Sequence, residues 1–199
     1  MHFNAIRGRW LPALLCLWGL TACGGGSDSA AAEAPAVPPA PTAPTTPASP
    51  QALSTCGLSD FAAQALTRIN QYRANGASCG AEGRFAATGP LAWHDALTQA
   101  ADGHARDMAA SNYFSHTSLD GRTLAQRINA TGYVWSTAAE NIAAGQRSVA
   151  TVVDGWMASD GHCANLMRPA HQHLGLACAA GPAGSTYPTY WSLTLAAPR

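Results

Sequence analysis

The stretch Asp160-Gly161-His162-Cys163-Ala164-Asn165 places a histidine beside a glycine at the predicted start of a helix. Two further segments carry a polar residue in a comparable setting, Phe114-Ser115-His116-Thr117-Ser118 and Ala139-Glu140-Asn141-Ile142. Each has a turn-like context at the edge of a helical pattern, where a side chain can point into a cleft. Two imidazoles and a carboxylate suit a divalent metal ion, a proton-transfer site or the floor of a polar pocket. Because the three residues are spread over 47 positions, only tertiary folding can bring them together.

Further sequence words surround these three segments in a fixed order between about Leu58 and Leu195. They are Pro90-Leu91-Ala92-Trp93, His104-Ala105-Arg106-Asp107-Met108, Asp120-Gly121-Arg122, Trp156-Met157, Leu166-Met167 and Leu174-Gly175-Leu176-Ala177-Cys178. Together the words resemble the CAP superfamily, named for cysteine-rich secretory proteins, antigen 5 and pathogenesis-related 1 proteins, and specifically its bacterial branch. The resemblance implies an α+β fold, an α-β-α sandwich with a small antiparallel sheet between helical layers.

The resemblance also implies roles for the polar residues. His116 and His162 correspond to two cavity histidines, and Glu140 corresponds to a cavity glutamate. Eukaryotic relatives place a second glutamate about three positions after the tryptophan that is Trp156 here, where this chain has Ser159. Asp160 is the nearest substitute for that carboxylate; the alternative is that Asp160 caps a helix.

Residues 1–22 have the form of a lipoprotein signal peptide. Arg7 and Arg9 precede an apolar run of 11 residues, too short to span a bilayer, for which roughly 20 are needed. Leu20-Thr21-Ala22-Cys23 then matches the lipobox, which predicts that Cys23 carries fatty acyl chains such as palmitate. The alternative is an ordinary signal peptide with Cys23 incidental. Gly24 is not a retention aspartate, which favours the outer membrane of a cell envelope, or the cell surface.

Residues 23–54 form a Gly-, Ala- and Pro-rich linker with seven prolines and no aromatic residue. Such a segment buries too little apolar surface to offset its ordering entropy, and we expect an extended spacer. Residues 55–199 are then one CAP (SCP-like) domain of ordinary size. The formal net charge of the chain is zero, and no basic run indicates nucleic acid as a partner.

Four cysteines remain in the domain once Cys16 and Cys23 are set aside: Cys56, Cys79, Cys163 and Cys178. An even number in an exported domain predicts two disulfide bonds. Three pairings are open, of which we favour Cys56–Cys79 across the first helix and Cys163–Cys178 near the candidate site. A four-cysteine zinc site is disfavoured because the chain has no Cys-x-x-Cys pair.

Apolar spacing predicts four helices in the first part of the domain and strands at the end. The helices begin near Ser59 or Asp60, after Trp93 with Asp95 as a cap, at about residue 122, and near Val149. Residues 174–178 and 190–195 read as an antiparallel hairpin. On the second helix His104 lies on the apolar stripe, which is typical of a core histidine.

Two hypotheses for the function follow. The first is a non-catalytic, monomeric binding module on the membrane, whose cavity takes a lipid, glycan, envelope component or partner protein; relatives are described mainly as lipid- or sterol-binding. The second is a hydrolase in which His116 and His162 hold Zn²⁺ or another divalent ion and Glu140 acts as general base or third ligand. The first needs no cofactor. Nucleophile and phosphate-loop motifs are absent from the sequence, which favours the binding module.

Overall fold

The computed structural model describes residues 53–199. The helices are α1 Phe61–Asn75, the 3₁₀ helix η1 Gly80–Glu82, α2 Asp95–Ala110, α3 Leu124–Ala130, α4 Val149–Met157 and α5 Asp160–Met167. The strands are β1 Ala77–Ser78, β2 Arg84–Phe85, β3 Ala92–Trp93, β4 Trp135–Ala144, β5 His173–Ala180 and β6 Thr189–Pro198.

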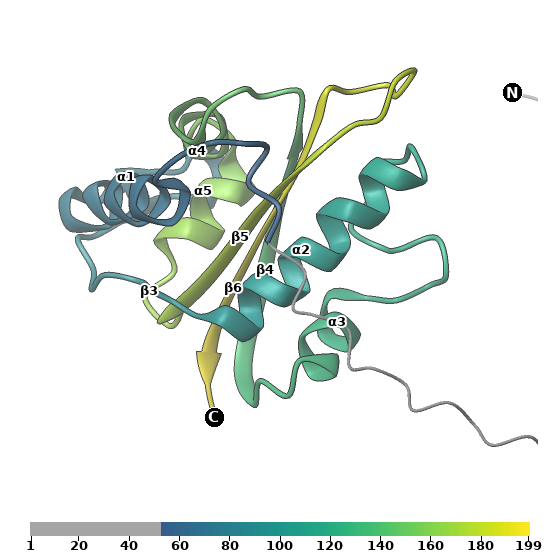
Figure 1. The fold of residues 1–199 in the computed structure, drawn as a ribbon. Coiled ribbons are helices and arrows are strands. Elements are labelled where there is room, and N and C mark those ends of the chain that lie inside the picture. The colour runs from purple at the N-terminus through teal and green to yellow at the C-terminus, as the bar shows by residue number, and fades with distance from the viewer. Residues whose placement is uncertain (1–52) are drawn as a thin grey trace, which may run out of the picture. The chain divides into compact units, whose positions relative to one another are not determined.

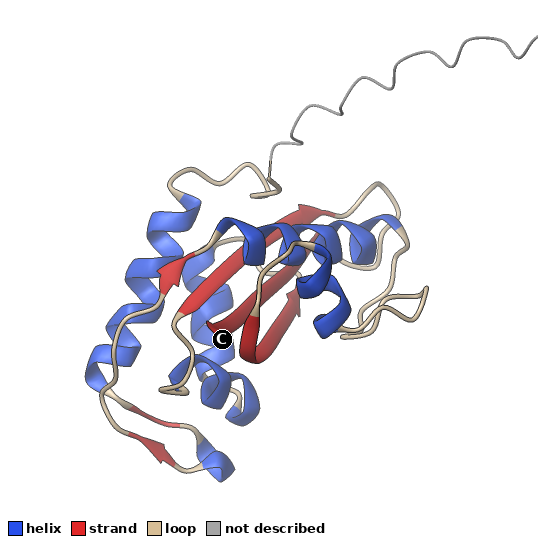
Figure 2. Cartoon of the chain, turned by 90° about the horizontal axis from the view of Figure 1, so that it is seen from below, coloured by secondary structure: helices blue, strands red, loops and turns tan. Residues whose placement is uncertain are grey.

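A four-stranded sheet in the order β3-β5-β6-β4 forms the middle layer. β5 pairs antiparallel with β6, and β6 with β4, while the two-residue β3 pairs parallel with β5. Helices α1, α4 and α5 cover one face and α2 with α3 covers the other (Figures 1 and 2). The predicted α+β sandwich, with a mainly antiparallel sheet between helical layers, is confirmed.

Each face of the sheet has its own apolar core. On one face Ile69 of α1, Val153 of α4 and Leu166 of α5 pack with Leu193 and Trp191 of β6. On the other, small residues of α2 such as Ala101 and Ala105 lie against Ala177 of β5. Helix α2 approaches β5 so closely that a Cβ at Gly175 would collide with the backbone of Leu97 and Thr98. The small residues therefore set the depth at which α2, and with it His104, sits.

The predicted helices form close to their expected bounds. Asp60 precedes α1, but in a left-handed conformation and without a side-chain cap bond. His94, not Asp95, occupies the N-cap position of α2, where its Nδ1 accepts from the backbone of Ala96 at 3.3 Å. Thr123 and Gln126 form a reciprocal capping box at the start of α3. The late hairpin is also confirmed as β5 and β6.

The turn-like interpretation of Glu140 is wrong. Glu140 lies in the middle of β4, a ten-residue strand that pairs along its length with β6, with Glu140 opposite Thr194. The segment is rich in alanine, which is depleted in strands, so local propensity gave no sign of it. The long ladder with β6 overrides the weak local preference.

The favoured disulfide pairing is also wrong. The bonds join Cys56 to Cys178 and Cys79 to Cys163, with Cα–Cα distances of 5.3 and 5.4 Å. The prediction joined cysteines that are near one another in sequence. In the fold the start of the domain runs beside β5, with an isolated parallel bridge between Thr55 and Cys178, which places Cys56 next to Cys178.

Ser54, near the start of the described residues, is hydrogen-bonded to the domain. Ser54 donates its N–H to Asp102 Oδ1 at 2.7 Å, and its carbonyl accepts from Cys178 N at 2.8 Å. The predicted signal peptide, Cys23 and nearly all of the predicted linker lie outside the described residues. Within residues 53–199, none of the helices has the length and apolar character that a membrane crossing requires.

Candidate functional site

Glu140 is a buried carboxylate on the edge strand β4, with its side chain only 3% exposed. Its Oε2 accepts from His116 Nδ1 at 2.8 Å. Its Oε1 accepts from Arg127 Nη2 at 2.8 Å and from Ser192 Oγ of β6 at 3.4 Å. A buried charge is tolerated only when it is paired and hydrogen-bonded, and Glu140 meets both conditions.

Arg127 joins Glu140 to the loop that carries His116. From the buried face of α3, its guanidinium donates to the carbonyls of His116 at 3.1 Å and Arg122 at 3.0 Å, and to Ser118 Oγ at 3.4 Å. One cation therefore neutralises the carboxylate and also fixes the backbone of residues 116–122. The side chain of Arg127 is 3% exposed, so water does not screen this ion pair appreciably.

The bond to Glu140 decides how His116 is protonated. An ionised carboxylate can only accept hydrogen bonds, so Nδ1 of His116 must carry a proton. In the neutral ring, Nε2 is then the basic nitrogen. The side chain is 57% exposed, so the pair presents a polarised imidazole at the surface of the domain.

His104 supports the same loop from the interior. It is fully buried, and its Nε2 lies 2.9 Å from the carbonyl of Ser115, the residue before His116. Because a carbonyl only accepts, Nε2 carries the proton. Burial lowers the pKa of His104, although Glu140, 3.9 Å away, opposes this. His104 is thus the core histidine that the apolar stripe predicts, and it also positions the loop of His116.

His162 reaches the site from α5, on the opposite side of β4. The helix is fixed to the strand by Asn141 Nδ2, which donates to the carbonyl of His162 at 3.0 Å, and by Asn165 Nδ2, which donates to Asn141 Oδ1 at 2.9 Å. Burial lowers the pKa of His162, and the nearby His116 lowers it further. His162 is therefore neutral at physiological pH.

His116, Glu140 and His162 line one polar pocket of about 360 Å³. The predicted convergence of the three segments is thus seen in the structure. The rest of the lining is Glu82, Ser159, Gly161, Ala164, Asn165 and Arg168. Sequence reasoning missed Glu82, whose 3₁₀ helix is attached to α5 by the Cys79–Cys163 disulfide.

Asp160 does not line this pocket. Its Oδ2 accepts from the backbone of Ala81 at 2.8 Å, and it makes no side-chain cap to α5, whose N-cap is Ser159. The carboxylate instead fixes the turn at Gly80–Glu82, where it lies so near Gly80 that a Cβ there would collide with it. The extra carboxylate at the pocket is therefore Glu82 and not Asp160.

The electrostatics keep Glu140 ionised. Burial raises the pKa of its carboxyl, but the hydrogen bond from His116 and the charge of Arg127 more than offset this, so the pKa lies below 4.5. A carboxyl with a lowered folded pKa stabilises the fold at pH values above its unfolded pKa. That stability is lost as the pH falls through the folded pKa.

The residues do not form a complete metal site. Within residues 53–199, no group of three or more His, Cys, Asp or Glu side chains is arranged to hold a metal ion. Both oxygens of Glu140 already accept hydrogen bonds, and Arg127 places a cation 2.8 Å from one of them. A catalytic zinc takes three protein ligands, and of the three predicted ligands only the two histidines are free of that competition.

The sequence held an unused signal for Arg127. On α3 it stands three residues after Leu124 and one before Ile128, so it lies on the apolar stripe of a short helix. A charged residue on a buried stripe requires a buried partner, and Glu140 is a carboxylate in an apolar context. Ser192 and Glu82 gave no comparable signal.

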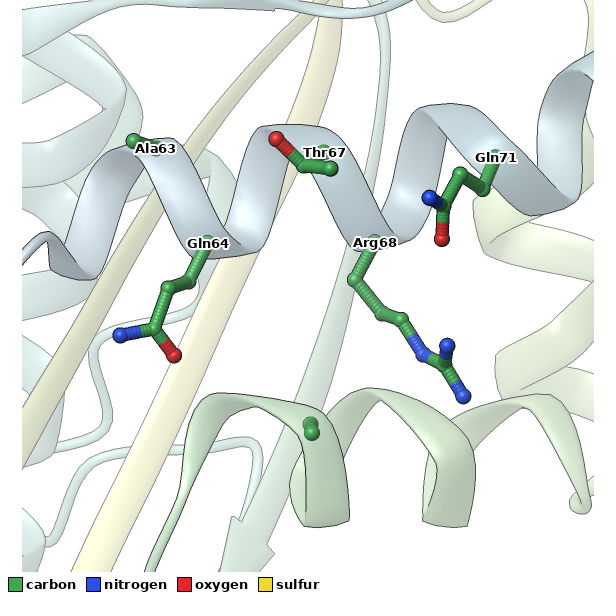
Figure 3. A pocket seen from close by; sticks show the side chains of 6 residues that line it. Ala63, Gln64, Thr67, Arg68 and Gln71 are labelled. Atoms are coloured by element: carbon green, nitrogen blue, oxygen red, sulfur yellow. The ribbon is translucent and has the colours of Figure 1, made fainter.

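Two of the other hollows in the described domain bear on the choice of site. One, of about 300 Å³, is lined by His162 together with apolar and aromatic residues. The other lies between α1 and α4, where Gln64 and Arg68 point from α1 toward α4 (Figure 3). Arg68 donates to both carboxylate oxygens of Asp154 at 2.8 Å, so its charge is already paired there. We therefore place the candidate site at the His116–Glu140–His162 pocket.

The sequence matches the model of the CAP family, described as the cysteine-rich secretory protein family, over residues 66–195. Among curated proteins, it is 36% identical over 87 residues to the uncharacterized protein YkwD of Bacillus subtilis, covering 44% of this chain and 34% of that protein. It is 35% identical over 86 residues to the uncharacterized membrane protein YlbC of the same organism, covering 43% and 25%. The match therefore spans about a third or less of each relative.

Two solved structures of bacterial proteins resemble the domain. An outer surface protein of Borrelia burgdorferi superposes with a TM-score of 0.50 at 20% identity, covering 56% of this chain and 80% of that one. An extracellular protein containing a SCP domain from Bacillus anthracis gives a TM-score of 0.47 at 32% identity, covering 55% and 34%.

Replacing Arg127 should test the ion pair on which this site rests. Arg127→Met leaves a buried carboxylate without its cation, and we expect a loss of about 3–5 kcal/mol in the free energy of unfolding at pH 7. The loss should shrink at acidic pH, because Glu140 without the charge of Arg127 takes up a proton more readily and its buried charge is then removed. Urea unfolding at pH 7 and pH 4 measures both values.

Arg122→Met is the matched control, because Arg122 pairs with Asp120 at the surface and such pairs contribute about 0–1 kcal/mol. The double variant Arg127→Met/Glu140→Met should regain part of the loss, since the unpaired charge is gone. If Arg127→Met costs no more than Arg122→Met, the ion pair does not organise the site.

Proposed function

Because this chain belongs to the CAP family, the cysteine-rich secretory proteins, we propose that it is an exported, membrane-anchored binding module whose ligand occupies the His116–Glu140–His162 pocket. The observation that carries the proposal is the state of Glu140. Its oxygens are engaged by Arg127, His116 and Ser192, so the carboxylate serves to hold the pocket in shape rather than to take up protons or metal.

The chemistry of the pocket favours recognition of a polar, uncharged group. His162 is neutral, and the largely exposed ring of His116 also lines the pocket. Asn165 and Ser159 add an amide and a hydroxyl, and Glu82 and Arg168 contribute one charge of each sign. A few placed polar groups of this kind fix the orientation of a ligand. A lipid head group, a glycan or a peptide of the envelope would meet these donors and acceptors.

The alternative, a zinc hydrolase using His116, His162 and Glu140, has less support. Glu140 is not available as a third ligand for the reasons given above, and no nucleophile motif accompanies the histidines. Two histidines alone would allow weak binding of Zn²⁺, which is compatible with the binding module. To act as a ligand or base, Glu140 would have to give up its hydrogen bond to Arg127 or to His116.

Separate observations support export of the protein and its anchoring to a membrane. The first residues, the lipobox match and the linker composition have the form expected of a lipoprotein, and the two disulfides suit an oxidising compartment. Similar structures come from an outer surface protein and an extracellular protein, and a similar curated sequence is described as a membrane protein. We propose that acyl chains on Cys23 anchor a monomer to the envelope, with no nucleic acid as partner.

Cys23→Ala tests the anchor. Without the thiol no acyl chain can be attached, so we expect the protein to move from the membrane fraction to the soluble exported fraction, or to remain as the uncleaved precursor. Fractionation followed by mass spectrometry of the mature N-terminus measures this. Wild-type protein that is wholly soluble, with an unmodified N-terminus, would refute the anchor.

The binding function is tested on the full-length protein in detergent by NMR of its histidine side chains. Two probes are added separately, a lipid extract and a solubilised glycan extract of the same envelope. With one of them we expect the His116 and His162 signals to shift while His94, which caps α2, stays unchanged. A panel of peptide, ester and amide substrates should show no turnover. Hydrolysis that a chelator stops and Glu140→Gln abolishes would contradict the proposal, as would unchanged histidine signals with both probes.

A further inference from the structure

A second pocket adjoins the candidate site and shares His162 with it. It has a volume of about 300 Å³, at the lower end of the roughly 300–1,000 Å³ range of small-molecule sites. Its wall includes Ile142 of β4 and Trp156 of α4, and its other aromatic members are Phe114 and Tyr187. The residues that line it carry no formally charged side chain at neutral pH, so its ligand is recognised without ion pairs.

Phe114 and Tyr187 form an exposed aromatic pair at this pocket. Their side chains come from the loop after α2 and from the β5–β6 hairpin, with ring centroids 6.0 Å apart and planes inclined at 59°. Phe114 is 46% exposed and Tyr187 is 37% exposed. Most large apolar side chains of this domain are buried, and Phe114 and Tyr187 are exceptions. Their exposed ring faces are available to a ligand.

The side chain of Asn112 helps to hold the hairpin that carries Tyr187. Asn112, at the end of α2, accepts on its Oδ1 from Thr186 N at 2.8 Å, Tyr190 OH at 2.9 Å and Ser185 Oγ at 3.2 Å. The rings of Tyr187 and Tyr190 also meet edge to face at 5.8 Å. The aromatic pair is therefore pre-organised, which reduces the entropy lost on binding.

Gln146 supplies a polar atom that lacks a partner. Its Oε1 is buried and accepts no hydrogen bond from the described residues, although Gln146 lines the same pocket. Its backbone carbonyl accepts hydrogen bonds from Thr189 Oγ1 at 2.8 Å and Trp191 Nε1 at 3.0 Å. The backbone from which the side chain extends is therefore fixed. A buried acceptor without a donor is costly. Because Oε1 is itself closed to solvent, rotation of the side chain into the pocket would let a ligand hydroxyl satisfy it.

From these features we infer that the pocket binds a neutral saccharide unit. A sugar ring offers an apolar C–H face to aromatic rings and hydroxyl donors to a buried acceptor, and it needs no charged partner. Phe114 and Tyr187 would take the ring face, and Gln146 Oε1 would accept from a hydroxyl. An acyl chain would fill the volume but leave that acceptor unsatisfied. The inference rests on the proposed function in one respect, because this pocket shares His162 with the His116–Glu140–His162 pocket and the inference names the class of its ligand.

The test uses the full-length protein in detergent and titration calorimetry with a β-1,4-linked tetramer of N-acetylglucosamine as probe. Tyr187→Ala should weaken binding by about fivefold or more, the usual loss when an aromatic anchor is truncated. Gln146→Leu removes the acceptor at similar size and should weaken sugar binding while strengthening binding of palmitate. Leu119→Ala is the control, since Leu119 is 70% exposed and does not line the pocket.

The outcomes separate this inference from the proposed function. Sugar binding that falls in Tyr187→Ala and Gln146→Leu, but persists in His116→Ala, supports the saccharide pocket independently of the His116–Glu140–His162 pocket. Sugar binding lost only in His116→Ala overturns the inference and leaves the proposed function standing. Binding of palmitate or a neutral tetrapeptide without any binding of the sugar, or sugar binding that neither variant weakens, overturns it as well.

Discussion

Glu140 carries a negative charge into the interior of the domain, and the surrounding structure is arranged to compensate it. Arg127 supplies the opposite charge, and His116 and Ser192 complete the hydrogen bonds. Because Arg127 also holds the carbonyls of His116 and Arg122, the same ion pair shapes the loop that forms one wall of the pocket. Removing either charge would leave the other buried, so the carboxylate and the loop depend on each other.

The sandwich supplies the rigid frame that this ion pair needs. β4 is an edge strand, so Glu140 can meet α2 and α3 on one side while α5 approaches from the other. The asparagine pair Asn141–Asn165 ties α5 to the strand, and the Cys79–Cys163 disulfide ties the Glu82 segment to α5. The segments of Glu82, His116 and α5 are distant in sequence. They meet β4 at one pocket because each is attached to β4 or to a neighbour of β4.

The main helices could be predicted from the sequence because apolar spacing is a local property. The fold class and the convergence of His116, Glu140 and His162 followed from the ordered sequence words that resemble the family. The sequence did not predict β4, since an alanine-rich strand exists only through its ladder with β6. The predicted disulfide pairing was wrong because separation in sequence does not show which segments lie side by side in the fold. Arg127 could have been found, since a charge on a buried helical stripe demands a partner, whereas Glu82 depends on a tertiary contact with no local sign.

Glu140 stays ionised in the interior of the domain and directs the proton of His116 to Nδ1. Histidine ¹⁵N and carboxyl ¹³C NMR of the full-length protein, followed from pH 8 to pH 3, measures both properties together. We expect neutral His116 with its proton on Nδ1, and a Glu140 carboxyl that titrates below its ordinary value of 4.5. A His116 ring with its proton on Nε2, or a Glu140 carboxyl that titrates above 4.5, would contradict the account.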